Sequence, residues 1–355
     1  MSASKRRLIF PLVNTLIFGA LFFVVGYYLN DVLKWTVIGA GMGLGIGLLV
    51  EWVTKALGGW VYRRRVLLAA LLEIVLMIVF IGPLVMVLAM TGGRAEAICC
   101  IEASGLGDAV EAVRIPVADG EALAGWFAPP APEKQGAVIL VLHGSQANRL
   151  GSLAHAQVLH AAGYGVLVYD QRALGESTGS RTSFGWYDAR DISPIIDYLA
   201  ARPEVDGERI GGVGLSLGAY ILLAAGPDEP RLRAIWADGL GPNHIDDFPP
   251  MRDASEEFIK FINRQMLWMA AVYLGIDDPV RFTDAIPAFA PRYLTLIAGG
   301  LDAFETRAND HLQQFLGANG SYWLIENAPH VGGLWTLPDE YRARMIAFFD
   351  DSIGS

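Results

Sequence analysis

The stretch RIGGVGLSLGAYILLAAG, residues 209–226, places a Gly-x-Ser-x-Gly pentapeptide between a short apolar run and a longer one. This arrangement is typical of a strand that turns sharply into a helix and exposes a nucleophilic serine at the turn. Gly214 and Gly218 would let the strand and the helix approach closely, and the amino end of the helix would favour developing negative charge. The pattern therefore predicts that Ser216 is a nucleophile.

A second pentapeptide of the same type, GESTG at residues 175–179, lies in a different context. It follows the polar run DQRAL, and the turn-forming residues TGSRTSFG come after its serine, Ser177. Because neither a strand nor a helix flanks it, we expect Ser177 to be structural.

Short apolar runs alternate with helical segments on both sides of the first pentapeptide. The predicted strands span residues 110–117, 121–127, 137–143, 166–170, 209–214, 234–238, 293–299 and 321–326. The predicted helices lie near residues 150–162, 186–201, 217–226, 306–317 and 339–350. Continuous apolar strands that alternate with helices predict an α/β fold with a mostly parallel sheet covered by helices on both faces.

Residues 243–290 interrupt this alternation and predict a helical cap. One long helix is expected near residues 253–274, opened by Asp253 and Glu256 as a capping box. Because loops at the carboxyl ends of parallel strands bind substrates, we expect the cap to contribute to substrate binding.

A nucleophilic serine needs a base, and the base needs an acid that orients it. His330 lies in a loop directly after the last predicted strand, and His244, at the start of the cap, is the second choice. Asp302 follows the seventh strand at a Gly-Gly turn, and Glu305 is held in reserve because it begins the next helix. The chain order Ser216, Asp302, His330, with each residue just past the end of a strand, predicts a catalytic triad.

The tetrahedral intermediate formed at such a serine needs two backbone N–H donors. The amide of Leu217, directly after the nucleophile, is one of them. The other is expected from the loop after His143, in which Gly144 and Ser145 are the candidates.

Residues 110–350 resemble the α/β-hydrolase superfamily, and within it the bacterial group labelled serine-aminopeptidase-like or dienelactone-hydrolase-like, some members of which are membrane-tethered. The residues that carry the resemblance are HGSQ at 143–146, DQRALGES at 170–177, GLSLG at 214–218, AGGLDAF at 298–304 and APHVGG at 328–333. The loop after His143 departs from the glycine-rich run of many lipases. In relatives the DQRALGES segment is a structural loop, which accounts for GESTG.

The resemblance implies a role for each site residue. Ser216 would be the nucleophile, with His330 as general base and then acid, and Asp302 as the group that orients it. The amides of Ser145 and Leu217 would form the oxyanion hole. The resemblance thus implies an α/β-hydrolase fold with a helical cap.

The first 93 residues are far more apolar than the rest of the chain and predict a membrane anchor. Runs at about residues 8–29, 36–54 and 66–90 are each near the roughly 20 apolar residues that cross a bilayer, so three transmembrane helices are expected. Glycines four apart in the second run suit close packing of helices in lipid. Residues 94–109 are interpreted as a linker to the hydrolase domain.

The distribution of charge predicts an orientation in the membrane. Residues 1–93 carry 8 basic and 3 acidic side chains, a net +5, so the total of −10 leaves −15 for the rest. Basic residues precede the first run and fill the loop between the second and third, which the positive-inside rule assigns to the cytoplasm. We therefore expect a multi-pass cell-membrane protein whose hydrolase domain lies outside the cytoplasm.

Other chemistries find no support in the sequence. The two cysteines, Cys99 and Cys100, exclude a disulfide framework, and two buried or interfacial thiols are favoured over a bond between neighbours. No metal-ligand cluster or nucleotide-binding loop is present, and the acidic soluble part offers no basic surface for nucleic acid. No cofactor, metal or nucleic-acid partner is expected.

Together these features predict a membrane-anchored serine hydrolase that cleaves small carboxylic esters, with acyl or lipid-like substrates favoured by the apolar cap. One alternative is a peptidase or amidase, in which Asp246, Asp247 and Asp253 of the cap would attract a substrate ammonium group. The other is a non-catalytic interaction protein, bound to the membrane, on the same scaffold.

Overall fold

The computed structural model describes residues 12–20, 22–23, 32–56, 71, 74–276 and 279–354. It divides into two compact units, of which the larger comprises Gly93–Glu256 and Ala271–Ser355. The smaller comprises Met1–Gly92 together with Glu257–Ala270.

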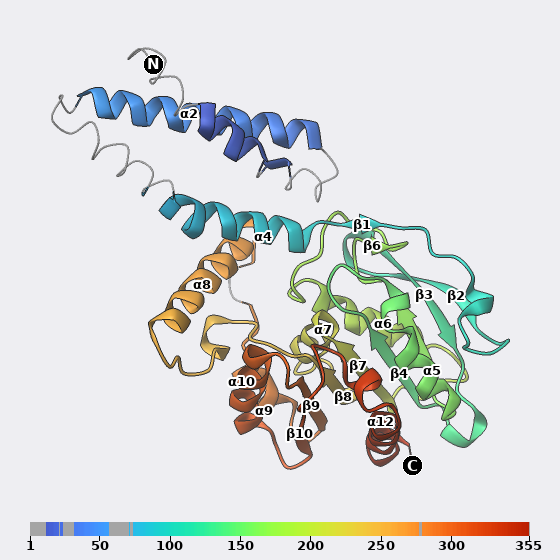
Figure 1. Ribbon diagram of the computed structural model, residues 1–355. Coiled ribbons are helices and arrows are strands. Elements are labelled where there is room, and N and C mark those ends of the chain that lie inside the picture. The colour runs from blue at the N-terminus through green and yellow to red at the C-terminus, as the bar shows by residue number, and fades with distance from the viewer. Residues whose placement is uncertain are drawn as a thin grey trace. The chain divides into compact units, whose positions relative to one another are not determined.

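The larger unit is built on an eight-stranded sheet in the order β10-β9-β8-β7-β4-β5-β3-β2 (Figure 1). Its strands are β2 (Glu111–Pro116), β3 (Ala122–Ala128), β4 (Val138–Leu142), β5 (Gly165–Tyr169), β7 (Ile210–Leu215), β8 (Leu232–Asp238), β9 (Tyr293–Gly299) and β10 (Gly320–Ile325). The β2–β3 and β3–β5 pairings are antiparallel, and all the others in this sheet are parallel. The mostly parallel sheet and all eight predicted strands are confirmed.

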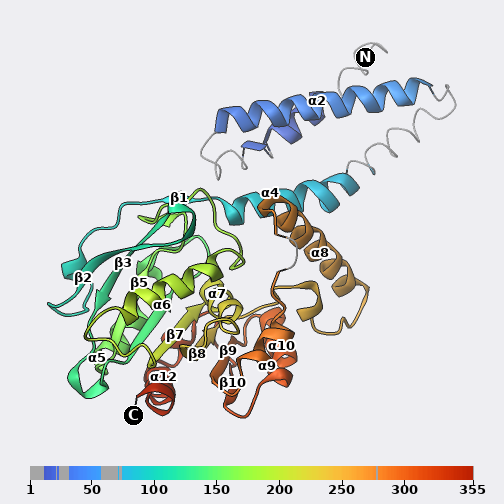
Figure 2. The same ribbon diagram turned by 180° about the vertical axis from the view of Figure 1, so that it is seen from behind.

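Helices cover both faces of the sheet, as Figures 1 and 2 show. One buried core contains side chains of α6 (Ile192–Ala200), α7 (Leu217–Ala225), α9 (Phe282–Phe289) and α10 (Ala303–Leu312). The other contains side chains of α5 (Leu153–Ala161), α11 (Gly333–Thr336) and α12 (Pro338–Ile353). Every residue of β4, β5 and β7 is buried, because a central strand has a helical layer on either side.

The predicted cap differs from the structure in its extent. The long helix α8 (Ala254–Leu274) is present, and the Asp253 side chain caps it by accepting N–H bonds from Ser255 and Glu256. However, α9 follows it within the same insertion, and its apolar side chains Phe282, Ile286 and Phe289 are buried in the core beside the sheet. The insertion at 243–290 therefore includes a helix that belongs to the core of the larger unit.

Residues 94–109 are not a free linker, which corrects the sequence-based interpretation. Strand β1 (Arg94–Ala95) pairs in parallel with β6 (Leu174–Gly175), and Leu106 is buried in the core that contains α5 and α12. The segment is held by backbone hydrogen bonds and by apolar burial, so it is part of the larger unit.

The two cysteines also differ from expectation. Cys99 and Cys100 are exposed and form a disulfide with each other. The backbone of Cys100 is in the left-handed region, with φ of 74°. The expectation of two buried or interfacial thiols is wrong.

In the smaller unit, α2 (Val32–Ala56) packs closely against the helical residues 12–20 and 22–23. A Cβ added to Gly39 would lie 2.4 Å from the Cβ of Phe22, and one added to Gly43 would lie 2.3 Å from the carbonyl oxygen of Asn14. The glycines four apart thus form the contact, as the sequence predicts.

Only part of the predicted membrane anchor meets the length and hydropathy expected of a bilayer span. Among the described residues one helical run does so, Ile74–Thr91, with 18 residues and a mean hydropathy of 2.7. It consists of residues 74–76, a π-helical turn at Met77–Ile81 and helix α4 (Gly82–Thr91). The apolar part of α2, Thr36–Trp52, is shorter, and much of the first predicted run lies outside the described residues. The expectation of three transmembrane helices is therefore not supported.

Candidate active site

Ser216 occupies the sharp turn between β7 and α7. Its φ of 51° and ψ of −115° are unusual for a residue other than glycine, and its amide donates a hydrogen bond to the carbonyl oxygen of Asp238 at 2.8 Å. A Cβ on Gly214 would lie 2.4 Å from the amide nitrogen of Ala219, and one on Gly218 would lie 2.6 Å from the Cβ of Leu142. Both glycines are therefore required for the turn, and the strained serine projects from it.

His330 lies beside this serine. The loop after β10 brings its Nε2 atom to 3.0 Å from the Oγ atom of Ser216. The other ring nitrogen, Nδ1, is hydrogen-bonded to the Oε2 atom of Glu305. Ser216, His330 and Glu305 thus form a continuous chain of hydrogen bonds.

The carboxylate that contacts His330 belongs to Glu305, which corrects the expectation of Asp302. The Oδ1 atom of Asp302 accepts hydrogen bonds from the amides of Phe304 at 2.9 Å and Glu305 at 3.0 Å. It therefore caps α10, a role for which aspartate is strongly preferred. Glu305, 4% exposed, is fixed by the amide of Gly299, which donates to its Oε1 atom at 2.7 Å.

The sequence contains a signal that distinguishes the two acids. In LDAFE, residues 301–305, an aspartate precedes a glutamate by three positions at the start of a helix, the spacing of an N-cap residue and the last residue of the first turn. An aspartate side chain at the N-cap is engaged by the helix backbone, which disfavours Asp302 as the acid. The glutamate can close a capping box, as expected from the sequence for Glu256, or contact another group, and Glu305 contacts His330.

The loop after β4 lies next to Ser216, and hydrogen bonds of His143 hold it in place. A Cβ on Gly144 would lie 3.4 Å from the Cβ of Ser216. The Nε2 atom of His143 accepts the amide of Gln171 at 3.1 Å, so its Nδ1 atom carries the proton and donates to the carbonyl oxygen of Gly144 at 2.8 Å. Burial lowers the pKa of His143 to about 4, which keeps this ring neutral. The turn that contains Gly144 and the exposed Ser145 is therefore held in one conformation.

A comparison with known protein families identifies the fold. The model of the alpha/beta hydrolase family matches residues 138–345, more than half of the chain. This chain belongs to the α/β hydrolase family.

Several curated relatives of this α/β hydrolase are named as uncharacterized proteins. YfhR of Salmonella typhimurium is 33% identical over 118 residues, which cover 32% of this chain and 40% of the relative. YqkD of Bacillus subtilis is 34% identical over 109 residues, covering 31% and 35%. YfhR of Escherichia coli O157:H7 is 29% identical over 245 residues, covering 67% and 80%. The first two matches thus span well under half of each relative.

Solved structures share the fold. An esterase from Pyrococcus furiosus, Pf2001, has a TM-score of 0.58 and 21% identity, covering 74% of this chain and 99% of the esterase. A dienelactone hydrolase from Anabaena variabilis has a TM-score of 0.50 and 19% identity, covering 69% and 98%. At these identities the likeness establishes the fold alone.

The charge on His330 in this α/β hydrolase is set mainly by Glu305. The hydrogen bond that the Nδ1 atom of His330 donates to Glu305 raises the pKa of His330, partial burial opposes it, and the negative charges of Asp238 and Asp302 add to the increase. The imidazole side chain is 47% exposed, so it can be reached from solvent.

The serine of the second pentapeptide, Ser177, and the second-choice base, His244, have structural roles. The hydroxyl of the buried Ser177 donates to the carbonyl oxygen of Asp170 at 2.5 Å and accepts the amide of Ala124 at 2.9 Å. The Nδ1 atom of His244 accepts the amide of Asp246 at 3.1 Å and so caps a short helical turn. Neither side chain joins the hydrogen-bonded chain at Ser216.

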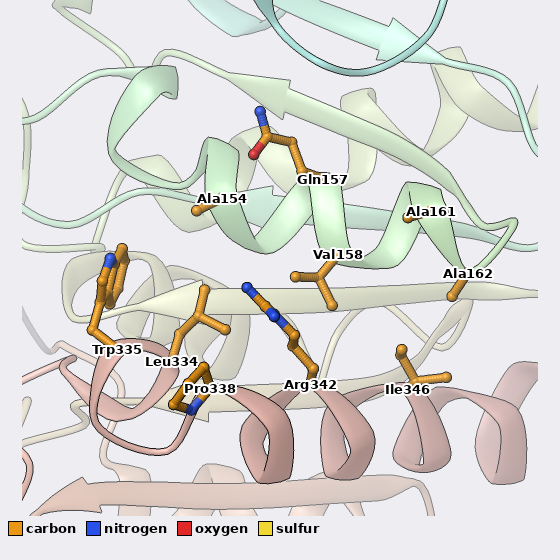
Figure 3. A pocket seen from close by; sticks show the side chains of 10 residues that line it. All are labelled: Ala154, Gln157, Val158, Ala161, Ala162, Leu334, Trp335, Pro338, Arg342 and Ile346. Carbon is orange, nitrogen blue, oxygen red and sulfur yellow. The ribbon is translucent and has the colours of Figure 1, made fainter.

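A groove in the larger unit is shown in Figure 3. It has a volume of about 700 Å³ between α5 and the α11–α12 segment, and Arg342 extends from α12 toward Val158 of α5. Its lining residues are Ala154, Gln157, Val158, Ala161, Ala162, Leu334, Trp335, Pro338, Arg342 and Ile346. Ser216, His330 and Glu305 do not line this groove.

Within the described ranges, no group of three or more His, Cys, Asp or Glu side chains is arranged to hold a metal ion. The arrangement at Ser216 matches covalent catalysis by a nucleophile with an adjacent base and an acid that orients it.

Proposed function

We propose that the chain is a serine hydrolase with Ser216 as nucleophile, His330 as general base and Glu305 as the acid that orients the base. The observation that carries this proposal is the pair of hydrogen bonds that His330 makes, one to the hydroxyl of Ser216 at 3.0 Å and one to Glu305. The strained backbone at Ser216 supports it, because such strain concentrates at functional sites.

The reaction follows from this geometry. As the Oγ atom of Ser216 attacks the substrate carbonyl carbon, the Nε2 atom of His330 accepts its proton, and Glu305 stabilises the imidazolium. The imidazolium then donates that proton to the leaving oxygen, which yields an acyl-enzyme and an alcohol. A water molecule deprotonated by His330 attacks the acyl carbon, the acid departs, and Ser216 recovers its proton.

The oxyanion of each tetrahedral intermediate needs donors placed in advance. The amide of Leu217, at the first position of α7, and the amide of Ser145, in the loop beside Ser216, are proposed for this role. The hydrogen bonds between His143 and both Gln171 and Gly144 support the proposal, because they fix the loop before substrate binds.

Small carboxylic esters, including acyl and lipid-like ones, are the proposed substrates. Two of the solved structures with the same fold are named as an esterase and a dienelactone hydrolase. Both names denote enzymes that cleave carboxylic esters.

A peptidase or amidase that binds a substrate ammonium group finds less support. The buried carboxylate of Asp247 accepts amides of Asn243 at 3.0 Å and His244 at 2.8 Å. Asp253 caps α8, and Asp246 lies 3.3 Å from Arg281. The acids of the cap are thus already engaged within the protein.

We also propose that the N-terminal region anchors the hydrolase in the cell membrane. The apolar run Ile74–Thr91 and the close packing at Gly39 and Gly43 support this. The basic side chains among residues 1–93 favour a cytoplasmic N-terminus and a hydrolase domain on the outer side of the membrane.

Hydrolysis of matched substrates tests the reaction class. The full-length protein in detergent would be assayed with p-nitrophenyl acetate and butyrate, and with alanine p-nitroanilide. We expect ester hydrolysis that Ser216→Ala abolishes and Ser177→Ala retains. Turnover of the anilide in preference to the esters would contradict the ester proposal, and equal activity of Ser216→Ala and wild type would contradict a serine mechanism.

A further inference from the structure

A second buried carboxyl group lies at the end of β8, close to the proposed active site. Asp238 is 1% exposed, and its Oδ2 atom accepts a hydrogen bond from the hydroxyl of Tyr341 at 2.7 Å. The same hydroxyl accepts the indole N–H of Trp236 at 2.9 Å. Because Tyr341 belongs to α12, this network ties the C-terminal helix to the carboxyl end of the sheet.

The main chain at Asp238 contacts the nucleophile and the base. Its carbonyl oxygen accepts the amide of Ser216 at 2.8 Å. The next residue, Gly239, has a φ of 78°, and a Cβ there would lie 2.7 Å from the Cε1 atom and 3.1 Å from the Nδ1 atom of His330. The imidazole therefore rests on the peptide that follows Asp238, and any shift of this segment would move both residues.

The charge of Asp238 also acts on the base. Burial raises the pKa of Asp238 to about 7; the hydrogen bond from Tyr341 and the charge of His330 oppose this increase, and the charge of Glu305 adds to it. In turn the negative charge of Asp238 raises the pKa of His330, after the larger effect of Glu305 and together with Asp302. The groups that face Asp238 are thus Tyr341 from α12, Glu305 from α10 and His330.

We propose that Asp238 is a positioning residue for Ser216 and His330, held in place by Tyr341. Asp238 touches no reacting atom in this scheme. It acts through its backbone, which contacts Ser216 and His330, and through its negative charge, which favours the protonated form of His330. The inference rests on the proposed serine hydrolase function and adds a link between α12 and the site.

The chain offers a matched control for the Tyr341–Asp238 hydrogen bond. The hydroxyl of Tyr164 donates to the Oδ1 atom of Asp350 at 2.5 Å, and Asp350 also lies on α12. Tyr164→Phe and Tyr341→Phe therefore each remove one hydrogen bond between a tyrosine and an aspartate, and each of these bonds involves a residue of α12. Only the bond of Tyr341 leads to the proposed active site.

The test is the pH dependence of kcat/KM for p-nitrophenyl acetate in the full-length wild type, Asp238→Asn, Tyr341→Phe and Tyr164→Phe. Loss of the Asp238 charge disfavours protonated His330. The acid limb of the pH profile of kcat/KM should therefore lie at lower pH in Asp238→Asn than in the wild type, by roughly half a unit. Tyr341→Phe removes a donor that favours ionised Asp238, so its acid limb should move in the same direction by a smaller amount. Tyr164→Phe should lower the Tm without moving the limb.

Two results would overturn the inference. One is an acid limb in Asp238→Asn that coincides with that of the wild type; the other is an equal shift in Tyr164→Phe and Tyr341→Phe. If Asp238→Asn does not fold, as judged by circular dichroism, the comparison of the two tyrosine variants decides. An inactive wild type would instead contradict the proposed function, so the two failures are distinguishable.

Discussion

At the residue scale, His330 contacts both Ser216 and Glu305, and each contact depends on a local feature of the chain. The serine is recognisable because a strand precedes its pentapeptide and a helix follows it, and these flanks are local features. The acid depends on which of two nearby carboxylates the helix backbone uses. Asp302 caps α10, and this leaves Glu305 to contact His330.

Substitution of the two acids should separate their roles. Glu305→Gln removes the charge that stabilises protonated His330, so kcat/KM for p-nitrophenyl acetate should fall by about a hundredfold or more. Asp302→Asn should retain activity within a few-fold, because asparagine caps a helix as well as aspartate does. A larger loss in Asp302→Asn than in Glu305→Gln would show that Asp302 is the orienting acid.

The activity should also report the pKa of His330. The base must be neutral to accept the proton of Ser216, and the hydrogen bond that His330 donates to Glu305 raises the pKa of His330 above the usual 6.5. Activity should therefore be present at high pH and fall as the pH is lowered, with a midpoint above 6.5. The midpoint in Glu305→Gln should be lower, as a pH profile of kcat/KM would detect; an unchanged midpoint would contradict this coupling.

At the scale of helices and strands, periodicity predicts the elements that are long and regular. All eight strands of the sheet are found, because buried parallel strands appear as uninterrupted apolar runs. The helix α9 was missed because it is short and contains Pro287. The two-residue strand β1 was missed because its pairing with β6 depends on contacts distant in sequence. Such pairings leave no periodic signal.

The packing of α2 leads to a test within the smaller unit. Gly39 faces Phe22 so closely that Gly39→Leu must separate the two helices, whereas a Cβ on Gly41 meets no atom within 4 Å. Gly39→Leu should destabilise this unit by about 1–3 kcal/mol, and Gly41→Leu should have little effect. Proteolysis of the full-length protein in detergent micelles would measure this difference. Equal protection of the two variants would argue against the helix contact.

At the scale of the whole molecule, the sequence predicts an apolar N-terminal part and an acidic hydrolase part from composition alone. It does not predict the substrate, because the shape of a binding site depends on side chains from many loops. It also does not predict that residues 257–270 of α8 group with the N-terminal unit, since this grouping arises from tertiary contacts.

A topology measurement belongs to this scale. Alkaline phosphatase, which is active only outside the cytoplasm, would be fused after Ser355, and a cytoplasmic reporter would be fused there in parallel. The excess of basic residues at the N-terminus and in the loop between the second and third apolar runs predicts active phosphatase and a silent cytoplasmic reporter. The reverse pattern would contradict the proposed orientation.

The central claim is that Ser216 is a nucleophile activated by His330. Labelling of membranes with a fluorophosphonate probe tests it most directly, because the probe reacts with activated serines whatever the natural substrate is. We predict that the wild type and Ser177→Ala are labelled, and that Ser216→Ala and His330→Ala are not. An unlabelled wild type, or a Ser216→Ala protein that is labelled as strongly as the wild type, would contradict the account.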